Sequence, residues 1–284
     1  MFIYKSLIEV LETRPLVTVG IPTYNNPEGL LKTIGSILNQ EYQNLQVIIS
    51  DNNSTSYDVY ELLKDIIKND RRVKVFRQTT NIDMIPNFRF VMEQCEGEYF
   101  MWAADDDFFE LDFISECLKV FSANPDCVSV FSHFDVVDTN SGKVYDRITP
   151  TPASSDFLFV RLKLRIKEMI PNVVYGVHKY AVLKKTDRIA AFDWFDVLLS
   201  IQMVYYGKAY IIPHFLYHCG INGPRKPYSL TGKYLDFSTF KKRLREFMQD
   251  KLPLRQRLQL IGIAGFACLQ ADRRLKKVID NWHK

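Results

Sequence analysis

The sequence lacks the features that mark several large classes of protein. It contains neither a GxGxxG fingerprint nor a GxxxxGKS/T loop, the glycine-rich phosphate sites of nicotinamide enzymes and P-loop NTPases. Its 5 cysteines are widely spaced and form no CxxC pair, which favours free thiols in a reducing compartment over disulfides or a zinc site. No uncharged apolar run reaches about 18 residues, the length that a membrane-spanning helix needs. These absences argue against a nicotinamide oxidoreductase, an NTPase and an integral membrane protein.

An excess of charge of one sign is also missing. The 284 residues include 37 Lys and Arg and 33 Asp and Glu, and the net charge of +4 is too small to predict a nucleic-acid partner. Residues 1–15 carry Lys5, Glu9 and Glu12 and lack the apolar core of a signal peptide. We therefore expect a cytoplasmic protein with one large domain, or with one domain and an appendage.

Strand-like and helix-like segments alternate through the first part of the chain. Short buried strands are expected at residues 16–21, 45–50, 73–77 and 98–103, with apolar residues at helical spacing between them. This alternation predicts an α/β domain with a mostly parallel central sheet and helices on both faces. Three of the predicted strands run into polar clusters, which are Thr23-Tyr24-Asn25, Asp51-Asn52-Asn53 and Asp105-Asp106-Asp107. Because ligands of such sheets bind beyond the carboxyl ends of the strands, we expect a polar cleft there.

The three adjacent aspartates are the strongest chemical signal. Their carboxylates repel one another unless a cation or strong hydrogen-bond donors offset the charge. Mg²⁺ and Mn²⁺ prefer oxygen ligands and often bridge to substrate phosphates, so the triplet fits a site for a divalent cation and a diphosphate. The alternative is a solvated acidic turn that caps a helix beginning at Phe108.

Several motifs together resemble the inverting family 2 glycosyltransferases of the GT-A fold. The resemblance covers about residues 15–220 and rests on the run 17–26, on Val47-Ile48-Ile49-Ser50-Asp51-Asn52, and on Gly97-Glu98-Tyr99 leading to the aspartate triplet. It implies a GT-A fold and transfer of a sugar from a nucleotide-diphosphate donor to an acceptor hydroxyl, typical of bacterial surface polysaccharide assembly. It also implies Mn²⁺ or Mg²⁺ as cofactor.

The resemblance also implies roles for individual residues. Those of the nucleotide-sugar site would be Pro22, Thr23, Tyr24, Asn25, Asp51, Asn81, Asp105, Asp106 and His178. Those of the metal site would be Asp106, Asp107 and His218. Position 83 is Asp83 where the family usually has glycine, and Ala104 stands where its metal motif usually begins.

The family carries its catalytic base at the start of a later helix, and residues 193–199 resemble that helix. Asp196 keeps the family's spacing to Gly207 and is the first candidate, with Asp193 as the second. Either carboxylate would take the proton of the acceptor hydroxyl.

The chain from residue 236 to 284 differs in character from residues 1–235, the expected catalytic domain. It is basic, and Pro253 should divide it into two helices. Leu254, Leu258, Ile261, Phe266 and Leu269 fit packing on the core and fit equally a membrane interface with the basic residues facing anionic lipid. A lipid-linked saccharide acceptor, used at the inner face of a membrane, would suit the second arrangement. A nucleotide-sugar binding module without catalysis remains the alternative function.

Overall fold

The computed structural model describes residues 14–187, 194–221 and 237–282, with side chains described up to residue 271. The elements of the first half are β1 (Val17–Thr23), α2 (Pro27–Leu38), β2 (Leu45–Asp51), α3 (Val59–Leu62), α4 (Lys64–Asn69), β3 (Val73–Arg77), α5 (Met84–Glu93), β4 (Tyr99–Trp102), β5 (Phe108–Phe109) and α6 (Phe113–Ala123). Those of the second half are β6 (Cys127–Asp138), β7 (Val144–Ile148), α7 (Leu158–Glu168), the 3₁₀ helix η1 (Pro171–Tyr175), β8 (Val177–Lys179), α8 (Tyr180–Leu183), α9 (Phe195–Tyr206), β9 (Lys208–Ile221), α10 (Phe237–Gln249) and α11 (Leu254–Trp282).

The strands form a single sheet in the order β3-β2-β1-β4-β8-β6-β9-β5, with β7 paired to β6. Strands β1 to β4 are parallel to one another, as the alternating pattern predicts. Beyond β4 the longest pairing, β6 with β9, is also parallel, so the prediction of a mostly parallel sheet is confirmed. The short strand β8 runs antiparallel to both β4 and β6, and β5 and β7 are antiparallel to their partners. A parallel pair needs a long crossover connection. The chain between β6 and β9, which contains α7, α8 and α9, supplies that connection for the second half.

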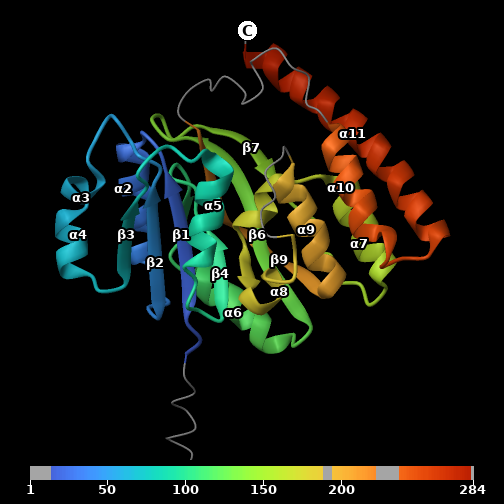
Figure 1. Cartoon of the computed structure of the whole chain (residues 1–284), viewed down its shortest axis with the longest axis horizontal. Helices are drawn as coiled ribbons and strands as arrows, with labels where there is room; N and C mark the ends of the chain where they lie inside the picture. The colour runs from blue at the N-terminus through green and yellow to red at the C-terminus, as the bar shows by residue number, and fades with distance from the viewer. Residues whose placement is uncertain (1–13, 188–193, 222–236, 283–284) are drawn as a thin grey trace, which may run out of the picture.

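The buried strands divide their side chains between the two faces of the sheet. Val17, Val19 and Ile21 of β1 share a core with α2 and α6, whereas Phe100 and Trp102 of β4 pack against α5 on the other face. This division follows from the two-residue period of a strand. It explains why β1, β2 and β4 are buried along their whole length, and why Figure 1 shows helices in front of and behind the sheet.

The helix after β1 begins as its sequence predicts. The side chain of Asn26 accepts a hydrogen bond from the Gly29 amide at 3.3 Å, and Pro27 occupies the first helical turn. The segment after Asp107 differs from the capped-helix alternative. Phe108 pairs with His218 as part of β5, and α6 begins only at Phe113.

The helices of the second half form a cluster at one end of the sheet (Figure 1). Phe240 and Leu244 of α10 and Leu260 of α11 share a core with α7 and α9. The helical structure is interrupted at Pro253, which lies between α10 and α11, as predicted. Among the described residues, none of the helices is both long enough and apolar enough to cross a membrane.

Candidate active site

A cleft of about 400 Å³ lies where the carboxyl ends of β1, β2 and β4 meet the start of α5. The residues that line it are Pro22, Thr23, Tyr24, Asn52, Asn81, Asp83, Met84, Asn87, Phe88, Ala104, Asp105, Asp106 and Tyr175. The predicted residues Pro22, Thr23, Tyr24, Asn81, Asp105 and Asp106 are thus brought together. This position at the sheet edge agrees with the general rule for ligand sites of open α/β sheets.

The backbone of residues 105–107, the acidic turn, is fixed by α2 on one side. Asn26 donates its side-chain amide to the carbonyl oxygen of Asp105 at 2.8 Å, and the Thr33 hydroxyl lies 2.7 Å from the carbonyl oxygen of Asp107. A Cβ atom added at Gly29 would lie 2.3 Å from the Asp105 carbonyl oxygen. The close approach of α2 therefore requires glycine at this position.

Strand β9 fixes the acidic turn from the other side. A Cβ atom at Gly220 would lie 1.7 Å from the carbonyl oxygen of Asp106, so the two backbones touch. The Gly220 amide also donates to the Asp107 carboxylate at 3.0 Å. The acidic turn is thus clamped between α2 and β9, and its carboxylates project from a rigid support.

The three aspartates have different surroundings. One carboxylate oxygen of Asp105 accepts hydrogen bonds from the Thr23 hydroxyl at 2.8 Å and the Tyr24 amide at 3.2 Å. Asp106 lines the cleft, although only 6% of its surface is exposed. Asp107 turns inward, where its carboxylate accepts hydrogen bonds from the Tyr217 hydroxyl at 2.5 Å and from Gly220. Burial raises the pKa of Asp107 to about 7. Asp107 therefore ties β9 to the acidic turn, and its predicted part in metal binding stays a prediction.

The amide side chains at the end of β2 shape the neighbouring wall. Asn52 donates to the side chain of Asn81 at 3.0 Å and accepts from the Ile82 amide at 2.8 Å. Asn87 exchanges hydrogen bonds with Ser50, accepting from its hydroxyl at 2.6 Å and donating to its carbonyl oxygen at 2.9 Å. These bonds join the end of β2 to the loop before α5 and to α5 itself, so the cleft wall is built by contacts between distant segments.

Asp51 and Asn25 lie beside the cleft rather than in its lining. The fully buried carboxylate of Asp51 accepts hydrogen bonds from the Ser54 amide and hydroxyl and lies 3.5 Å from the Arg77 guanidinium. Asn25 has a φ of +52° and accepts from the Thr55 amide at 2.8 Å. Both side chains hold the turns that follow β1 and β2. Their predicted contacts with the nucleotide stay predictions.

The two predicted histidines lie away from the cleft lining. His178 is buried behind Trp102, and its Nε2 lies 2.8 Å from the carbonyl oxygen of Val174, which makes Nε2 the protonated nitrogen. Burial lowers the pKa of His178 to about 4, so the ring is neutral. His218 bridges two carboxylates, with Nδ1 at 2.5 Å from Asp135 and Nε2 at 2.9 Å from Glu110. These positions fit structural roles for both rings, and their predicted roles in nucleotide-sugar and metal binding stay predictions.

Asp196 lies in the first turn of α9, half-buried, and its carboxylate accepts from the Val197 amide at 2.7 Å. Phe195 packs edge to face on Phe88, with ring centroids 6.4 Å apart, and Phe88 lines the cleft. The start of α9 therefore adjoins the cleft on its α5 side. Asp193 lies outside the described residues.

The charge of the cleft favours a cation. Its lining contains three carboxylates, from Asp83, Asp105 and Asp106, and the described lining residues include no Lys, Arg or His. Within the described part of the chain, no group of three or more Asp, Glu, His or Cys side chains could hold a metal by itself. Mg²⁺ and Mn²⁺ are commonly held by one or two carboxylates together with substrate phosphates. Asp105 and Asp106 fit that arrangement.

The sequence did not assign Asp83, Met84 or Phe88 to the site, whereas Tyr175 begins a stretch, residues 175–179, that resembles the family segment on the acceptor side. Phe88 is counted among the apolar residues of a helix, and its position at the cleft depends on how α5 is placed. Asp83 carries a usable signal, since it occupies the family's glycine position and has φ +69° and ψ 163°. That backbone conformation is one that glycine adopts readily and other residues rarely do.

Comparison with curated proteins finds several glycosyltransferases. The chain is 34% identical over 110 residues to an uncharacterized glycosyltransferase of Haemophilus influenzae, in an alignment covering 39% of this chain and 44% of the relative. It is also 34% identical over 94 residues to the GalNAc(5)-diNAcBac-PP-undecaprenol beta-1,3-glucosyltransferase of Campylobacter jejuni, covering 33% and 30% of the two chains. The matches thus span less than half the length of these relatives.

Solved structures share the fold at low sequence identity. S. aureus TarS 1-349 in complex with UDP-GlcNAc superposes with a TM-score of 0.67 at 17% identity, covering 87% of this chain and 71% of TarS. The mannosyltransferase PcManGT of Pyrobaculum calidifontis, in complex with GDP-Man and Mn²⁺, gives a TM-score of 0.59 at 14% identity, covering 94% and 76%. The predicted GT-A fold is confirmed. The model of the glycosyl transferase family 2 matches residues 18–187, more than half of the chain, and the chain belongs to that family.

Proposed function

We propose that the chain is an inverting, metal-dependent glycosyltransferase that moves a hexose from a UDP-sugar to the hydroxyl of a saccharide acceptor. The observation that carries this proposal is the cleft at the ends of β1, β2 and β4, with three carboxylates and no described basic side chain in its lining. Such a cleft repels a free diphosphate and accepts one that arrives with a divalent cation.

In this proposal the nucleoside lies along Pro22, Thr23 and Tyr24 and the amides of Asn52 and Asn81. Asp105 and Asp106 hold Mn²⁺ or Mg²⁺ against the diphosphate, since both residues line the cleft and lie on the acidic turn that α2 and β9 hold in place. A bound dication supplies positive charge that offsets the charge of the departing UDP. The structures with UDP-GlcNAc and with GDP-Man and Mn²⁺ support this choice of donor class and cofactor.

Asp196 acts as the catalytic base and takes the proton of the acceptor hydroxyl. This assignment is supported by the position of Asp196 in the first turn of α9. The neighbouring Phe195 packs on Phe88, which lines the cleft. Direct displacement with inversion needs one such base and no covalent intermediate. The second candidate, Asp193, is close by in sequence.

The acceptor is a saccharide or a lipid-linked saccharide of bacterial surface polysaccharide assembly, including lipopolysaccharide. The relative named as an undecaprenol-linked glucosyltransferase supports this class of acceptor. In the proposal the chain works in the cytoplasm and meets its acceptor at the inner face of the membrane, through its C-terminal helices.

The test is Asp196→Asn, measured for sugar transfer and for UDP-sugar binding with Mn²⁺. We expect transfer to fall roughly 10²–10⁴-fold, the usual contribution of a general base, with binding unchanged. The control is Asp65→Asn, which alters an exposed aspartate in the first turn of α4 and should leave both measurements intact.

Two other results would redirect the proposal. Retained transfer in Asp196→Asn would move the base elsewhere. A wild-type chain that binds UDP-sugar but transfers to no acceptor would favour the alternative, a nucleotide-sugar binding module.

A further inference from the structure

Helix α11 has an exposed apolar face opposite the one that it buries. Leu260, Ala264, Ala267 and Cys268 pack inward against α7 and α10. Among the residues of α11 whose side chains are described, the large apolar residues that are exposed are Leu254, Leu258, Phe266 and Leu269, each 61–62% exposed. Spaced by about one or two helical turns, they form a single stripe. Four large apolar side chains on one helix face mark a contact surface.

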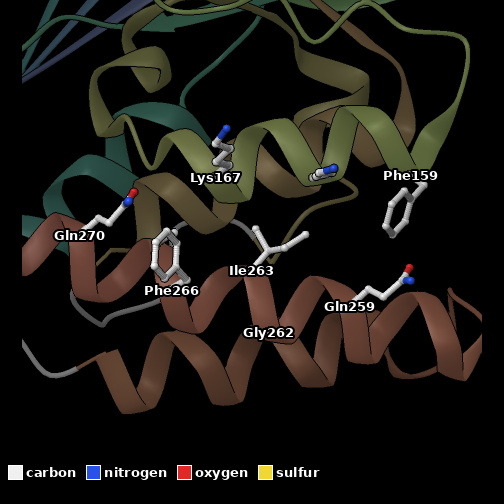
Figure 2. A pocket seen from close by; sticks show the side chains of 9 residues that line it. Phe159, Lys167, Gln259, Gly262, Ile263, Phe266 and Gln270 are labelled. Carbon is white, nitrogen blue, oxygen red and sulfur yellow. The ribbon is translucent and has the colours of Figure 1, made fainter.

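The stripe borders a groove between α7 and α11, with a volume of about 610 Å³ (Figure 2). Phe159, Lys163 and Lys167 of α7 line one side. The α11 side is lined by Gln259, Gly262, Ile263, Phe266, Ala267 and Gln270. Phe266 belongs to both the groove and the stripe, so the two form one continuous surface. We call the groove and the stripe together the α7/α11 face.

Helix α7 adds further apolar and basic groups on its outer side. Phe157, just before the helix, is 75% exposed and Val160 is 47% exposed. Lys163 and Lys167 are exposed and lie one turn apart. Apolar side chains and ammonium groups thus share one outward surface, as on helices that lie in a membrane interface.

The charge of this surface has one sign. Among the described residues, none that lines the groove is acidic, and the sequence contains no Asp or Glu between Asp250 and Asp272. The nearby acid of α7, Glu168, is paired with Arg165 at 2.9 Å. Lys163 and Lys167 therefore present their charge outward, where a layer of phosphate groups would be attracted.

We propose that the α7/α11 face docks on a bilayer containing anionic phospholipid. Lys163 and Lys167 contact the lipid phosphates, and Leu258 and Phe266 enter the acyl boundary. The assignment deepens the proposed function, since it identifies the surface by which the enzyme would reach a lipid-linked acceptor. In this assignment, basic residues of α7 contact the lipid phosphates, in addition to those of the C-terminal helices.

The test is co-sedimentation of the full chain with vesicles of phosphatidylcholine alone or mixed with phosphatidylglycerol. We expect the wild type to bind the mixed vesicles and to bind phosphatidylcholine weakly. Lys163→Ala/Lys167→Ala should weaken binding about 25-fold, at about fivefold per lysine. This loss should shrink at high salt, which screens the lysines. Leu258→Gln and Phe266→Gln should each weaken binding about tenfold at any salt concentration.

Matched controls come from the opposite end of the molecule (Figure 1). Lys64→Ala/Lys68→Ala removes the same charge at the same spacing from α4, and Leu31→Gln removes an exposed leucine of α2. Both should leave vesicle binding unchanged. Circular dichroism shows which variants fold, and the lysine pair, lying on the surface, tests the proposal even where Phe266→Gln does not fold.

Three results would overturn the proposal. The first is that the wild type binds both kinds of vesicle equally or binds neither. The second is that the α4 control weakens vesicle binding as much as the change of Lys163 and Lys167 does. The third is a wild-type dimer that Leu258→Gln dissociates without altering vesicle binding. The last would assign the face to a second copy of the chain. Because vesicle binding needs neither donor nor acceptor, its outcome is independent of whether the chain transfers sugar.

Discussion

The contact between Gly220 and the acidic turn allows a sharp test of how the site is built. A Cβ atom at position 220 would lie 1.7 Å from the Asp106 carbonyl oxygen, whereas ordinary van der Waals contact begins near 3.4 Å. In Gly220→Ala the two backbones must therefore separate by more than 1 Å. The same movement stretches the hydrogen bond from the Gly220 amide to Asp107.

Both stability and ligand binding should respond. Overpacking of this kind costs about 1–3 kcal/mol, which lowers the melting temperature by roughly 2–10 °C in a domain of this size. A misplacement of about 1 Å in a catalytic site can cost about 10²-fold in rate. We expect weaker binding of UDP with Mn²⁺, measured by calorimetry, at temperatures where the variant remains folded.

Gly265→Ala is the matched control. A Cβ atom at Gly265 meets nothing within 4 Å, and the residue lies within helix α11. Alanine should stabilise that helix by about 1 kcal/mol and leave UDP binding unchanged. If Gly220→Ala bound UDP and melted as the wild type does, the clamp on the acidic turn would be refuted.

Three further changes have calculable effects on stability. Asp83→Gly should raise the free energy of unfolding, measured by urea denaturation, by about 1 kcal/mol. The reason is that the backbone strain relieved at φ +69° outweighs the cost of the extra conformational entropy that glycine gives the unfolded chain, and an equal or lower free energy of unfolding would contradict this. Asn87→Ala should lower it by about 2–3 kcal/mol by leaving buried groups of Ser50 short of a partner, and a loss below about 0.5 kcal/mol would count against that bond pair. His178 has its pKa lowered from 6.5 to about 4, so the native state releases a proton that the unfolded state keeps, and stability is lost as pH falls from about 6.5 to 4. His178→Gln should remove about 3 kcal/mol of that pH dependence, and identical pH profiles would refute the assignment.

The strands and the acidic turn could be predicted because their signals are local. Consecutive β-branched and apolar residues mark β1 and β2, and both are buried along their whole length. A strand that enters a polar cluster places that cluster at the sheet edge, whatever the rest of the chain does. Asp105 and Asp106 accordingly reach the predicted cleft.

The role of Asp107 depended on contacts that no local pattern contains. Its partner Tyr217 lies 110 residues away in sequence, on a strand whose register against β5 brings the two side chains together. The three adjacent aspartates look equivalent in sequence. Only the packing of β9 shows that the side chain of Asp107 points into the core. The same holds for His178, which is buried because β8 inserts between β4 and β6.

Helix α11 shows a second limit of sequence patterns. The sequence leaves open whether Leu254, Leu258, Ile261, Phe266 and Leu269 pack on the core or face outward. Four of them are exposed, whereas Ile261 is half-buried against the core formed with the neighbouring helices. The buried face is instead made partly of small residues, including Ala264 and Ala267, which allow close packing against neighbouring helices. Periodicity shows that a helix has two faces, and packing decides which of them is covered.

The central claim is that the acidic turn binds a nucleotide diphosphate through a divalent cation. Calorimetric titration of UDP with and without Mn²⁺ tests it directly, using the wild type, Asp106→Asn and the control Asp65→Asn. We predict that Mn²⁺ tightens UDP binding in the wild type and the control, and that Asp106→Asn loses this gain. UDP binding of equal strength with and without Mn²⁺, or an undiminished gain in Asp106→Asn, would contradict the account.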